Sequence, residues 1–183
     1  MQYGDFTLWQ REVLESDGFE SRELGFWREV LRDLPQELDL PRDRPRPAVA
    51  TGRAGAVEFT VESHTLQALT EVAREQGASL FMALHAALAG TLARLGAGRD
   101  IPVGSPVAGR TDVALEELVG CFVNTVVVRS ELSGDPSFVE SLDRVRSAVL
   151  SALEHQEVPR CRSSGWSRRS TRSGRPGGTR CSR

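Results

Sequence analysis

The stretch VGCFVNTVVVR, residues 119–129, has the apolar continuity of a buried β-strand, interrupted by one amide. An amide costs roughly 1–3 kcal/mol to bury without hydrogen-bond partners. Asn124 therefore needs either a structural partner or a neighbouring group that it serves functionally, and the sequence leaves both alternatives open. Cys121 lies in the same run, where a small buried thiol is the expected state.

The first run predicts a strand at residues 121–131, and two further runs predict strands. DIPVGSPV, residues 100–107, is nearly as apolar as the first run, which is typical of a sheet covered on both faces. AVEFTV, residues 56–61, alternates apolar and polar side chains, as a half-buried strand does. The elements then alternate as helix, helix, strand, helix, helix, strand, strand, helix, which predicts an α/β class, an α+β sandwich.

The helices are predicted from apolar residues at helical spacing. They are expected within residues 6–17, 21–35, 64–77, 80–96 and 135–156. Ser21, Ser63 and Ser79 are the expected N-caps of the second, third and fourth helix. The fourth helix is apolar nearly all round and should be buried on most sides. Residues 37–55, rich in Pro and Arg, should form an extended surface connection.

Length and composition indicate one ordinary soluble domain. The chain has 183 residues, of which 39% are hydrophobic and 26% are charged. No apolar stretch approaches the roughly 18–20 residues that a membrane span needs, and the start shows no basic region followed by an apolar one. We therefore expect a cytoplasmic protein with no membrane partner.

The ordinary catalytic motifs are absent from the sequence. His64, His85 and His155 have no Cys, Asp or Glu at metal-ligand spacing, so no metal site is expected, and His85 should be a core residue. Cys121, Cys161 and Cys181 form neither a metal-binding pattern nor a disulfide framework. No P-loop, dinucleotide-binding or nucleophile-elbow motif occurs. The residues alone give a fold class and one unexplained asparagine.

The charge is divided unevenly along the chain. Residues 160–183 carry eight arginines and no acidic residue, whereas the preceding part is strongly acidic. A basic tail can bind nucleic acid by charge, but one tryptophan is a thin aromatic complement, and no nucleic-acid partner is expected. Residues 160–183 also lack any apolar period, so we expect them to be disordered.

Several segments together resemble the condensation domains of nonribosomal peptide synthetases. YGDFTLWQRE (3–12) resembles that family's tyrosine–aspartate–tryptophan–glutamine motif, and residues 26–47 resemble the linker after it. IPVGSPVAGRTDVALEELVGCFVNTVVVR (101–129) is similar to the long motif with glycine–arginine in its middle and valine–asparagine–threonine near its end. HQEVP (155–159) matches the start of the family's next motif.

The resemblance implies a fold like that of chloramphenicol acetyltransferase, with two lobes around a cleft and this chain forming mainly the second lobe. It implies the joining of an aminoacyl or peptidyl thioester on one carrier protein to an amine on another. No cofactor would bind this chain directly, because the substrates are carried on the phosphopantetheine arms of partner carrier proteins. Residues 1–159 are then a partial condensation domain.

The resemblance also implies roles for individual residues. Near the cleft it places Asn124 and Thr125, with Gly109 and Arg110, the arginine that pairs with an aspartate in the family. Residues that support the motifs' structure would be Tyr3, Asp5, Trp9, Gln10, Gly120, Arg129, His155 and Gln156. For Asn124, a hydrogen bond to a neighbouring loop stays an equal alternative, and Arg110 is expected to be solvated or re-paired.

The family's adjacent histidine pair, H-H-x-x-x-D-G, does not occur in this sequence. The expectation is therefore a chain without its first lobe, with little or no activity alone, so that whether it is itself an enzyme stays open. The alternatives are a non-catalytic lobe that docks carrier proteins or a separately encoded first lobe, or a decayed gene product. A frameshift would explain residues 160–183, since a shifted frame permits PFERVVEALDPVRSPGRNPLFQ; a native basic tail is the alternative.

Overall fold

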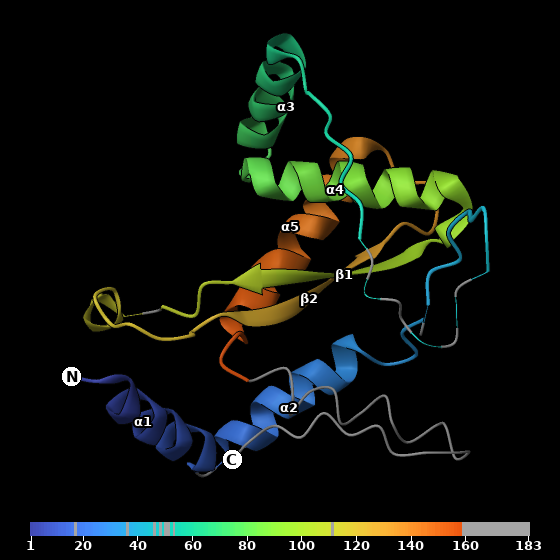
Figure 1. Ribbon diagram of the computed structural model, residues 1–183. Coiled ribbons are helices and arrows are strands. Elements are labelled where there is room, and N and C mark those ends of the chain that lie inside the picture. Colours follow the sequence, from blue (N-terminus) through green and yellow to red (C-terminus); the bar gives the residue numbers. More distant parts are fainter. Residues whose placement is uncertain are drawn as a thin grey trace. The chain divides into compact units, whose positions relative to one another are not determined.

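The computed structural model describes residues 1–16, 18–35, 37–45, 47, 49, 52, 54–110 and 112–158 (Figure 1). The expectations for residues 160–183, including disorder and the frameshift, lie outside the described residues. The elements are α1 Tyr3–Glu15, α2 Phe19–Val30, α3 Ser63–Glu75, α4 Leu80–Leu92, the π-helical turn η1 Ala93–Ala97, β1 Asp100–Val107, the 3-10 turn η2 Val113–Leu115, β2 Asn124–Glu131 and α5 Phe138–Glu154.

All the expected helices form, but two of the three expected N-caps are not the observed caps. The Ser79 side chain accepts a hydrogen bond from the Met82 backbone N–H at 3.3 Å, which confirms it as the N-cap of α4. α2 begins earlier than Ser21, directly after Gly18, whose φ of 78° is left-handed. Ser63 is the first residue of α3 rather than its cap. The three serines therefore indicated where the helices begin to within a few residues, but only Ser79 is itself an N-cap.

β1 and β2 form a two-stranded sheet. Leu132 N–H donates to Arg99 O at 2.7 Å beyond one end, and Gly104 lies beside Thr125 toward the other, so the strands are antiparallel. β1 matches its expected range. β2 begins at Asn124, so the expectation of a strand from residue 121 was wrong, and the expected burial of Cys121 was wrong too, since Cys121 is exposed.

The strand expected at residues 56–61 does not form. Val57 and Phe59 are 91% and 84% exposed, and no strand of the described residues pairs with this segment. The alternating sequence is therefore present without the neighbouring strand that a sheet requires.

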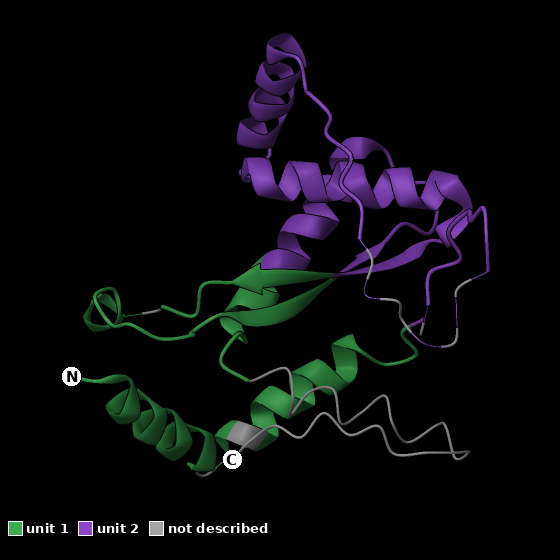
Figure 2. Cartoon of the chain, viewed as in Figure 1, with its two compact units in different colours: residues 1–34, 104–128, 150–183 green, residues 35–103, 129–149 purple. Residues whose placement is uncertain are grey.

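The chain divides into two compact units, coloured separately in Figure 2. Unit 1 comprises residues 1–34, 104–128 and 150–183, and unit 2 comprises residues 35–103 and 129–149. Unit 1 has a core around Trp27, Val126, Ala152 and Val158, and a smaller cluster of Phe6, Leu115 and Phe122. The core of unit 2 includes Ala89, Ala97, Ile101 and Leu132. Each unit thus has an apolar core of its own.

Helix α4 is buried on one face, not on most sides as the sequence suggested. Ala83 and Ala89 are fully buried, whereas Phe81, Leu84 and Leu88 are about half exposed. By length and composition, Leu80–Ala97 could cross a membrane, which corrects the expectation that no stretch could. The core helix of a soluble protein passes the same test, so one such helix is weak evidence for a membrane span.

Candidate functional site

In unit 1, motif residues that are far apart in the sequence meet. The Tyr3 hydroxyl at the start of α1 donates to the Cys121 carbonyl at 2.9 Å. The Tyr3 ring packs edge-on against the Phe122 ring with centroids 5.2 Å apart. The Phe6 ring also packs against the Phe122 ring, with centroids 4.7 Å apart. Aromatic pairs at such distances and edge-to-face geometry are favourable beyond simple burial. The YGDF and GCFVN segments are therefore joined by one aromatic cluster.

Two glycines permit this close approach. A Cβ on Gly120 would collide with the Tyr3 ring. A Cβ on Gly109 would collide with the Phe122 carbonyl oxygen, and its φ of 66° is left-handed, so a side chain is excluded twice over. Both glycines are required by geometry, and neither offers a functional group to a ligand.

Arg110 is bonded to the loop that follows it. Its guanidinium donates to the carbonyls of Leu115, Glu116 (3.4 Å) and Leu118 (2.8 Å), and lies 4.2 Å from the centroid of the Phe122 ring. A planar guanidinium suits this combination of several carbonyls and one aromatic face. Arg110 is thus re-paired with backbone carbonyls and holds residues 115–118 of the loop.

Asn124 holds the chain that leaves α5. Its Nδ2 donates to Gln156 O at 2.7 Å and Val158 O at 2.8 Å, while its Oδ1 accepts from the Thr125 backbone N–H at 2.9 Å. The amide in the apolar run is therefore satisfied by backbone groups. The sequence left open whether Asn124 has a structural partner or serves a functional group. The contacts of its side chain are with a structural partner, the backbone of residues 125, 156 and 158.

His155 is held by α2 next to these contacts. Its Nδ1 lies 2.8 Å from a Glu23 carboxylate oxygen, its carbonyl accepts from Trp27 Nε1 at 2.9 Å, and its ring stacks on Phe26. Glu23 is only 4% exposed, so its charge needs this partner. Side chains from α2 and β2 thus fix the carbonyls of residues 155, 156 and 158.

A cavity of about 140 Å³ lies among these residues in unit 1. Its walls include Tyr3, Gln10, Cys121, Asn124 and Glu157, and no histidine is among the described residues that line it. Burial, and next the charge of nearby Glu23, raise the pKa of the Glu157 carboxyl above its ordinary value. Ionisation of Glu157 is therefore less favourable than that of an exposed glutamate.

Some predicted site residues lie elsewhere. Arg129 forms a two-point ion pair with Asp100 in unit 2, at 2.8 and 2.7 Å. Asp5 accepts from the Gln2 backbone N–H at 2.7 Å and so caps its own helix. Trp9 is 48% exposed, and Thr125 is half-buried with its methyl beside Gly104.

Sequence reasoning missed Glu23, Trp27 and Glu157. Glu23 and Trp27 are four residues apart and so share one face of α2. A carboxylate on the apolar face of a helix was therefore a readable signal of a buried partner. Nothing in the sequence marks Glu157 as different from the other acidic residues.

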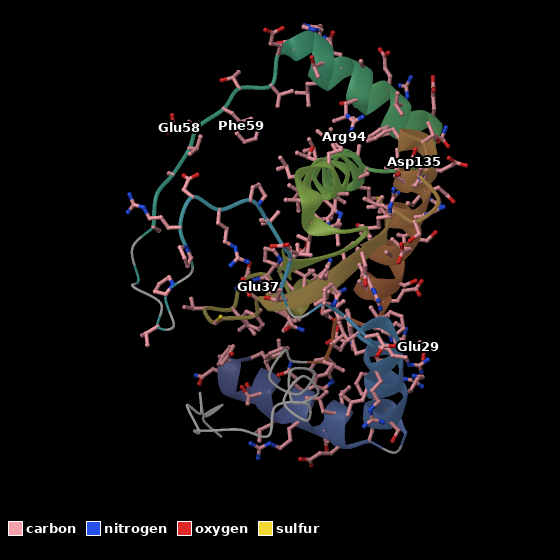
Figure 3. All side chains as sticks on the ribbon, turned by 90° about the vertical axis from the view of Figure 1, so that its right-hand side faces the viewer. Glu29, Glu37, Glu58, Phe59, Arg94 and Asp135 are labelled. Carbon is pink, nitrogen blue, oxygen red and sulfur yellow. The ribbon has the colours of Figure 1, made fainter. Side chains whose placement is uncertain are left out.

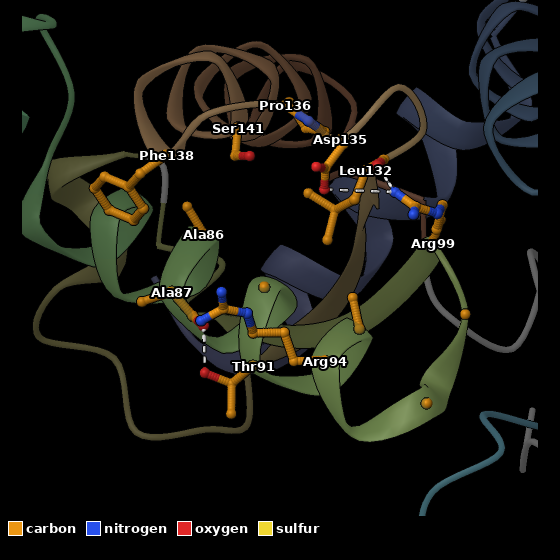
Figure 4. Close-up of a pocket in the computed structure, with 14 residues that line it drawn as sticks. Ala86, Ala87, Thr91, Arg94, Arg99, Leu132, Asp135, Pro136, Phe138 and Ser141 are labelled. Carbon is orange, nitrogen blue, oxygen red and sulfur yellow. Dashed lines mark hydrogen bonds and ion pairs between the residues drawn. The ribbon is translucent and has the colours of Figure 1, made fainter.

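A larger cavity, of about 710 Å³, lies in unit 2 (Figure 4). Small residues of α4 and η1 form much of its wall, together with Phe138 and Ser141 of α5. Its charged groups are Arg94, Arg99 and Asp135, the last two paired at 3.9 Å. None of the predicted site residues lines it. Among the described residues, no group of three or more His, Cys, Asp or Glu could hold a metal ion.

Three comparisons bear on these observations. The family model described as "Condensation domain" matches residues 1–161. The probable non-canonical nonribosomal peptide synthetase CymA of Salinispora arenicola is 51% identical over 163 residues, covering 87% of this chain and 2% of the relative. The dimodular nonribosomal peptide synthase of Bacillus subtilis is 47% identical over 163 residues, again 87% of this chain, and 7% of the relative.

Solved structures agree with the sequence relatives. The X-domain from teicoplanin biosynthesis superposes with a TM-score of 0.84 at 35% identity, covering 90% of this chain and 38% of that one. The same domain in complex with OxyB gives 0.84 at 34% identity, covering 90% and 37%. This chain thus spans a small part of its curated relatives and under two-fifths of the solved domain. The fold class expected from the sequence is confirmed.

Proposed function

Because this chain belongs to the condensation-domain family, we propose that it supplies one part of a domain that forms amide bonds in nonribosomal peptide synthesis. The donor is an aminoacyl or peptidyl thioester on the phosphopantetheine arm of one carrier protein, and the acceptor is an amine on another. Such a reaction between carrier-bound groups belongs in the cytoplasm. The two relatives are nonribosomal peptide synthetases, and carrier proteins are the partners that membership of the family implies.

The chemistry proposed is the attack of the acceptor nitrogen on the thioester carbonyl. A tetrahedral oxyanion forms, the C–S bond breaks, the thiol of the phosphopantetheine arm is released, and the nitrogen loses a proton. Two tethered reactants must be held in line and the oxyanion stabilised. A proton acceptor is needed as well, which in the family is the histidine of H-H-x-x-x-D-G.

One observation carries the proposal: three of the quoted motifs meet in unit 1 through direct side-chain contacts. Tyr3 binds the Cys121 carbonyl, and Asn124 binds the carbonyls of Gln156 and Val158. Segments that match the family in order along the sequence also meet in space, which a chance resemblance would not produce.

We assign the motif residues positioning roles. Asn124 and Arg110 hold backbone, while Gly109 and Gly120 permit close packing. His85 and His155 are already engaged with Ser130 and Glu23, and neither lines the cavity beside Asn124. The proton acceptor then has to come from a part of a condensation domain other than these residues.

The test is amide formation with purified donor and acceptor carrier proteins loaded with aminoacyl groups. The chain alone should give no dipeptide. The chain mixed with a polypeptide that carries the H-H-x-x-x-D-G motif of a relative should give product, and loss of the second histidine of that motif should abolish it. Dipeptide made by the chain alone would refute the proposed source of the proton acceptor.

A second candidate function is docking without catalysis. Its support is the likeness to the teicoplanin X-domain, which has been solved in complex with a second protein, OxyB. On this reading the chain would dock carrier proteins or a separately encoded first lobe. Binding of a carrier protein or of a chain with the H-H-x-x-x-D-G motif, with no amide formed in any mixture, would favour docking over the first proposal.

A further inference from the structure

The cavity of about 710 Å³ in unit 2 lies between α4 with the turn η1 on one side and the start of α5 on the other (Figure 4). Its volume is within the usual range of small-molecule pockets, roughly 300–1,000 Å³. The space exists because six of the lining residues have no side chain larger than a methyl group: Ala86, Ala87, Gly90, Ala93, Gly96 and Gly98. A Cβ added to Gly90 or Gly98 would meet no other atom within 4 Å.

The larger uncharged residues make the wall mostly apolar. Leu132 lies just after β2, and Phe138 begins α5. The two hydroxyls of the wall already donate within their own helices: Thr91 to the Ala87 carbonyl at 2.8 Å, and Ser141 to the Ser137 carbonyl at 2.9 Å. The body of a ligand in this cavity would therefore contact apolar surface, and its polar end would depend on the charged residues for hydrogen bonds.

The charged residues of the wall are Arg94, Arg99 and Asp135. Figure 3 shows Arg94 at the end of α4 and Asp135 at the start of α5. Arg94 forms no hydrogen bond or ion pair with the residues that the structure describes. Arg99 donates to the Leu132 carbonyl at 3.3 Å and lies 3.9 Å from the Asp135 carboxylate, whose side chain is 99% exposed, so this ion pair is weak. The wall thus carries one net positive charge, with the guanidinium of Arg94 available to a ligand.

This charge and these donors select the chemistry of the ligand. A guanidinium binds a carboxylate or a phosphate through two parallel N–H···O hydrogen bonds. A carboxylate brings the single negative charge that balances the wall, whereas a phosphate dianion exceeds it and is repelled by Asp135. A cation would face two arginines, and a neutral apolar molecule would leave the Arg94 donors unused.

We propose that the cavity of unit 2 binds a monocarboxylate with an apolar body. Arg94 binds the carboxylate, Arg99 adds positive charge, and the alanines and Phe138 contact the body. A fatty acid and the carboxyl end of an N-acylated amino acid or peptide share this chemistry. The site does not depend on amide formation, because none of the motif residues that were given positioning roles lines this cavity.

The test is calorimetric titration of the full 183-residue chain with octanoate and with N-acetylphenylalanine, which represent the two sources. At least one should bind at a single site, and octylamine, octanol and inorganic phosphate should bind at least about tenfold more weakly. Arg94→Gln should weaken binding of the carboxylate about tenfold, the usual effect of losing a hydrogen bond to a charged group. Asp135→Asn should strengthen it about threefold, because a nearby negative charge is removed.

A matched pair of glycine variants tests the position of the site. Gly90→Leu places a side chain in the cavity and should abolish binding without lowering the thermal midpoint, because leucine favours a helix more than glycine does. Gly25→Leu is the same change in α2 of unit 1, where an added Cβ also meets nothing within 4 Å, and it should retain binding.

Three results would each overturn the proposal. The first is that neither carboxylate binds. The second is that octanol or phosphate binds as tightly as the better carboxylate, since the charge of the wall would then not select a monocarboxylate. The third is that Arg94→Gln or a folded Gly90→Leu chain binds the carboxylate as tightly as the original chain, which would place the ligand elsewhere on the molecule.

Discussion

Asn124 shows how one amide can fix the course of a chain. Its two N–H groups reach carbonyls two residues apart, Gln156 O and Val158 O, where α5 has ended and helical hydrogen bonding no longer satisfies them. Because Val158 is 4% exposed and packs with Trp27 and Val126, its own carbonyl is largely removed from water. The asparagine therefore allows the chain after α5 to enter the core of unit 1.

Asn124→Ala should lower the free energy of unfolding by about 2 kcal/mol, because it leaves two carbonyls without their donor in a half-buried site. Urea denaturation measures this value. Thr125→Val is the matched control on the neighbouring residue: it removes a hydroxyl that forms no hydrogen bond with the described residues and should change stability by less than about 0.5 kcal/mol. Equal effects of the two changes would contradict the role given to Asn124.

His85 is a second buried polar residue, but with a poorer set of partners. Its Nδ1 lies 3.4 Å from the Ser130 hydroxyl, and within the described residues its Nε2 has no hydrogen-bond partner. Burial lowers the pKa of His85 below its ordinary 6.5. The expectation of a core histidine is confirmed, although its hydrogen bonding is incomplete.

This lowered pKa predicts a pH dependence of stability. As the pH falls through about 6.5, the unfolded chain takes up a proton at His85 before the folded chain does, so the free energy of unfolding falls with it. The decline ends below the lowered folded pKa. His85→Leu should remove this component between about pH 7 and 5 in urea titrations at several pH values. His64→Gln, at an exposed position, should retain it; loss of the slope in both variants, or in neither, would count against burial as the cause.

At the scale of the element, the start of α5 depends on a reciprocal cap. Ser137 N–H donates to the Glu140 carboxylate at 2.7 Å, and the Ser137 hydroxyl both donates to the same carboxylate and accepts from Glu140 N–H at 3.3 Å. The hydrogen bond from the Ser137 backbone N–H, and next the one from the Ser137 hydroxyl, lower the pKa of the Glu140 carboxyl below its ordinary 4.5. The helix was expected from residue 135, three residues before its observed first residue, Phe138.

Ser137→Ala should destabilise the chain by about 1 kcal/mol, the usual effect of losing an N-cap. Asp143→Ala, on the same helix but away from the cap, serves as the control and should have a smaller effect. The contribution of Glu140 is present above about pH 4.5 and is lost as the pH falls through its lowered folded pKa. Circular dichroism during urea unfolding at pH 7 and at pH 3 measures both; an equal loss from Ser137→Ala at the two pH values would contradict the reciprocal cap.

The elements also show what sequence patterns can and cannot give. α5 was predictable because Leu142, Val145 and Val149 repeat at helical spacing and are all buried. The strand was predicted from residue 121, but residues 120–122 instead contact Tyr3, more than a hundred residues away. The segment 56–61 has strand chemistry without a partner. A pattern can indicate a local preference, but a strand forms only where another chain segment pairs with it.

The same limit applied to the candidate site. The motif resemblance singled out Asn124 as a residue near the cleft and Tyr3 and Gly120 as structural motif residues, and the structure brings all three together in unit 1. It could not indicate that Glu23 and Trp27 fix His155, because those contacts join α2 to residues about 130 positions later. Long-range polar contacts of this kind leave little trace in one sequence.

At the scale of the whole molecule, each unit has its own core, yet unit 2 exposes a stripe along α4. Phe81, Leu84, Leu88 and Leu95 are 50%, 45%, 45% and 51% exposed, and their spacing places them along one side of the helix and the turn that follows it. Small residues, including Ala83 and Ala89, occupy the buried side. A stripe of this size favours self-association of the isolated chain.

The double variant Leu84→Gln, Leu88→Gln should reduce light scattering and the fluorescence of bound ANS, because both changes replace exposed apolar surface. Its free energy of unfolding should stay within about 0.5 kcal/mol of the original chain, as for other surface changes. Ala89→Gln is the matched control: a larger polar side chain in a fully buried position should cost about 2–3 kcal/mol through overpacking and an unpaired amide. If the leucine variant unfolds as readily as Ala89→Gln, the stripe is packed within the fold of this chain, and the isolated chain is more complete than its exposed surface indicates.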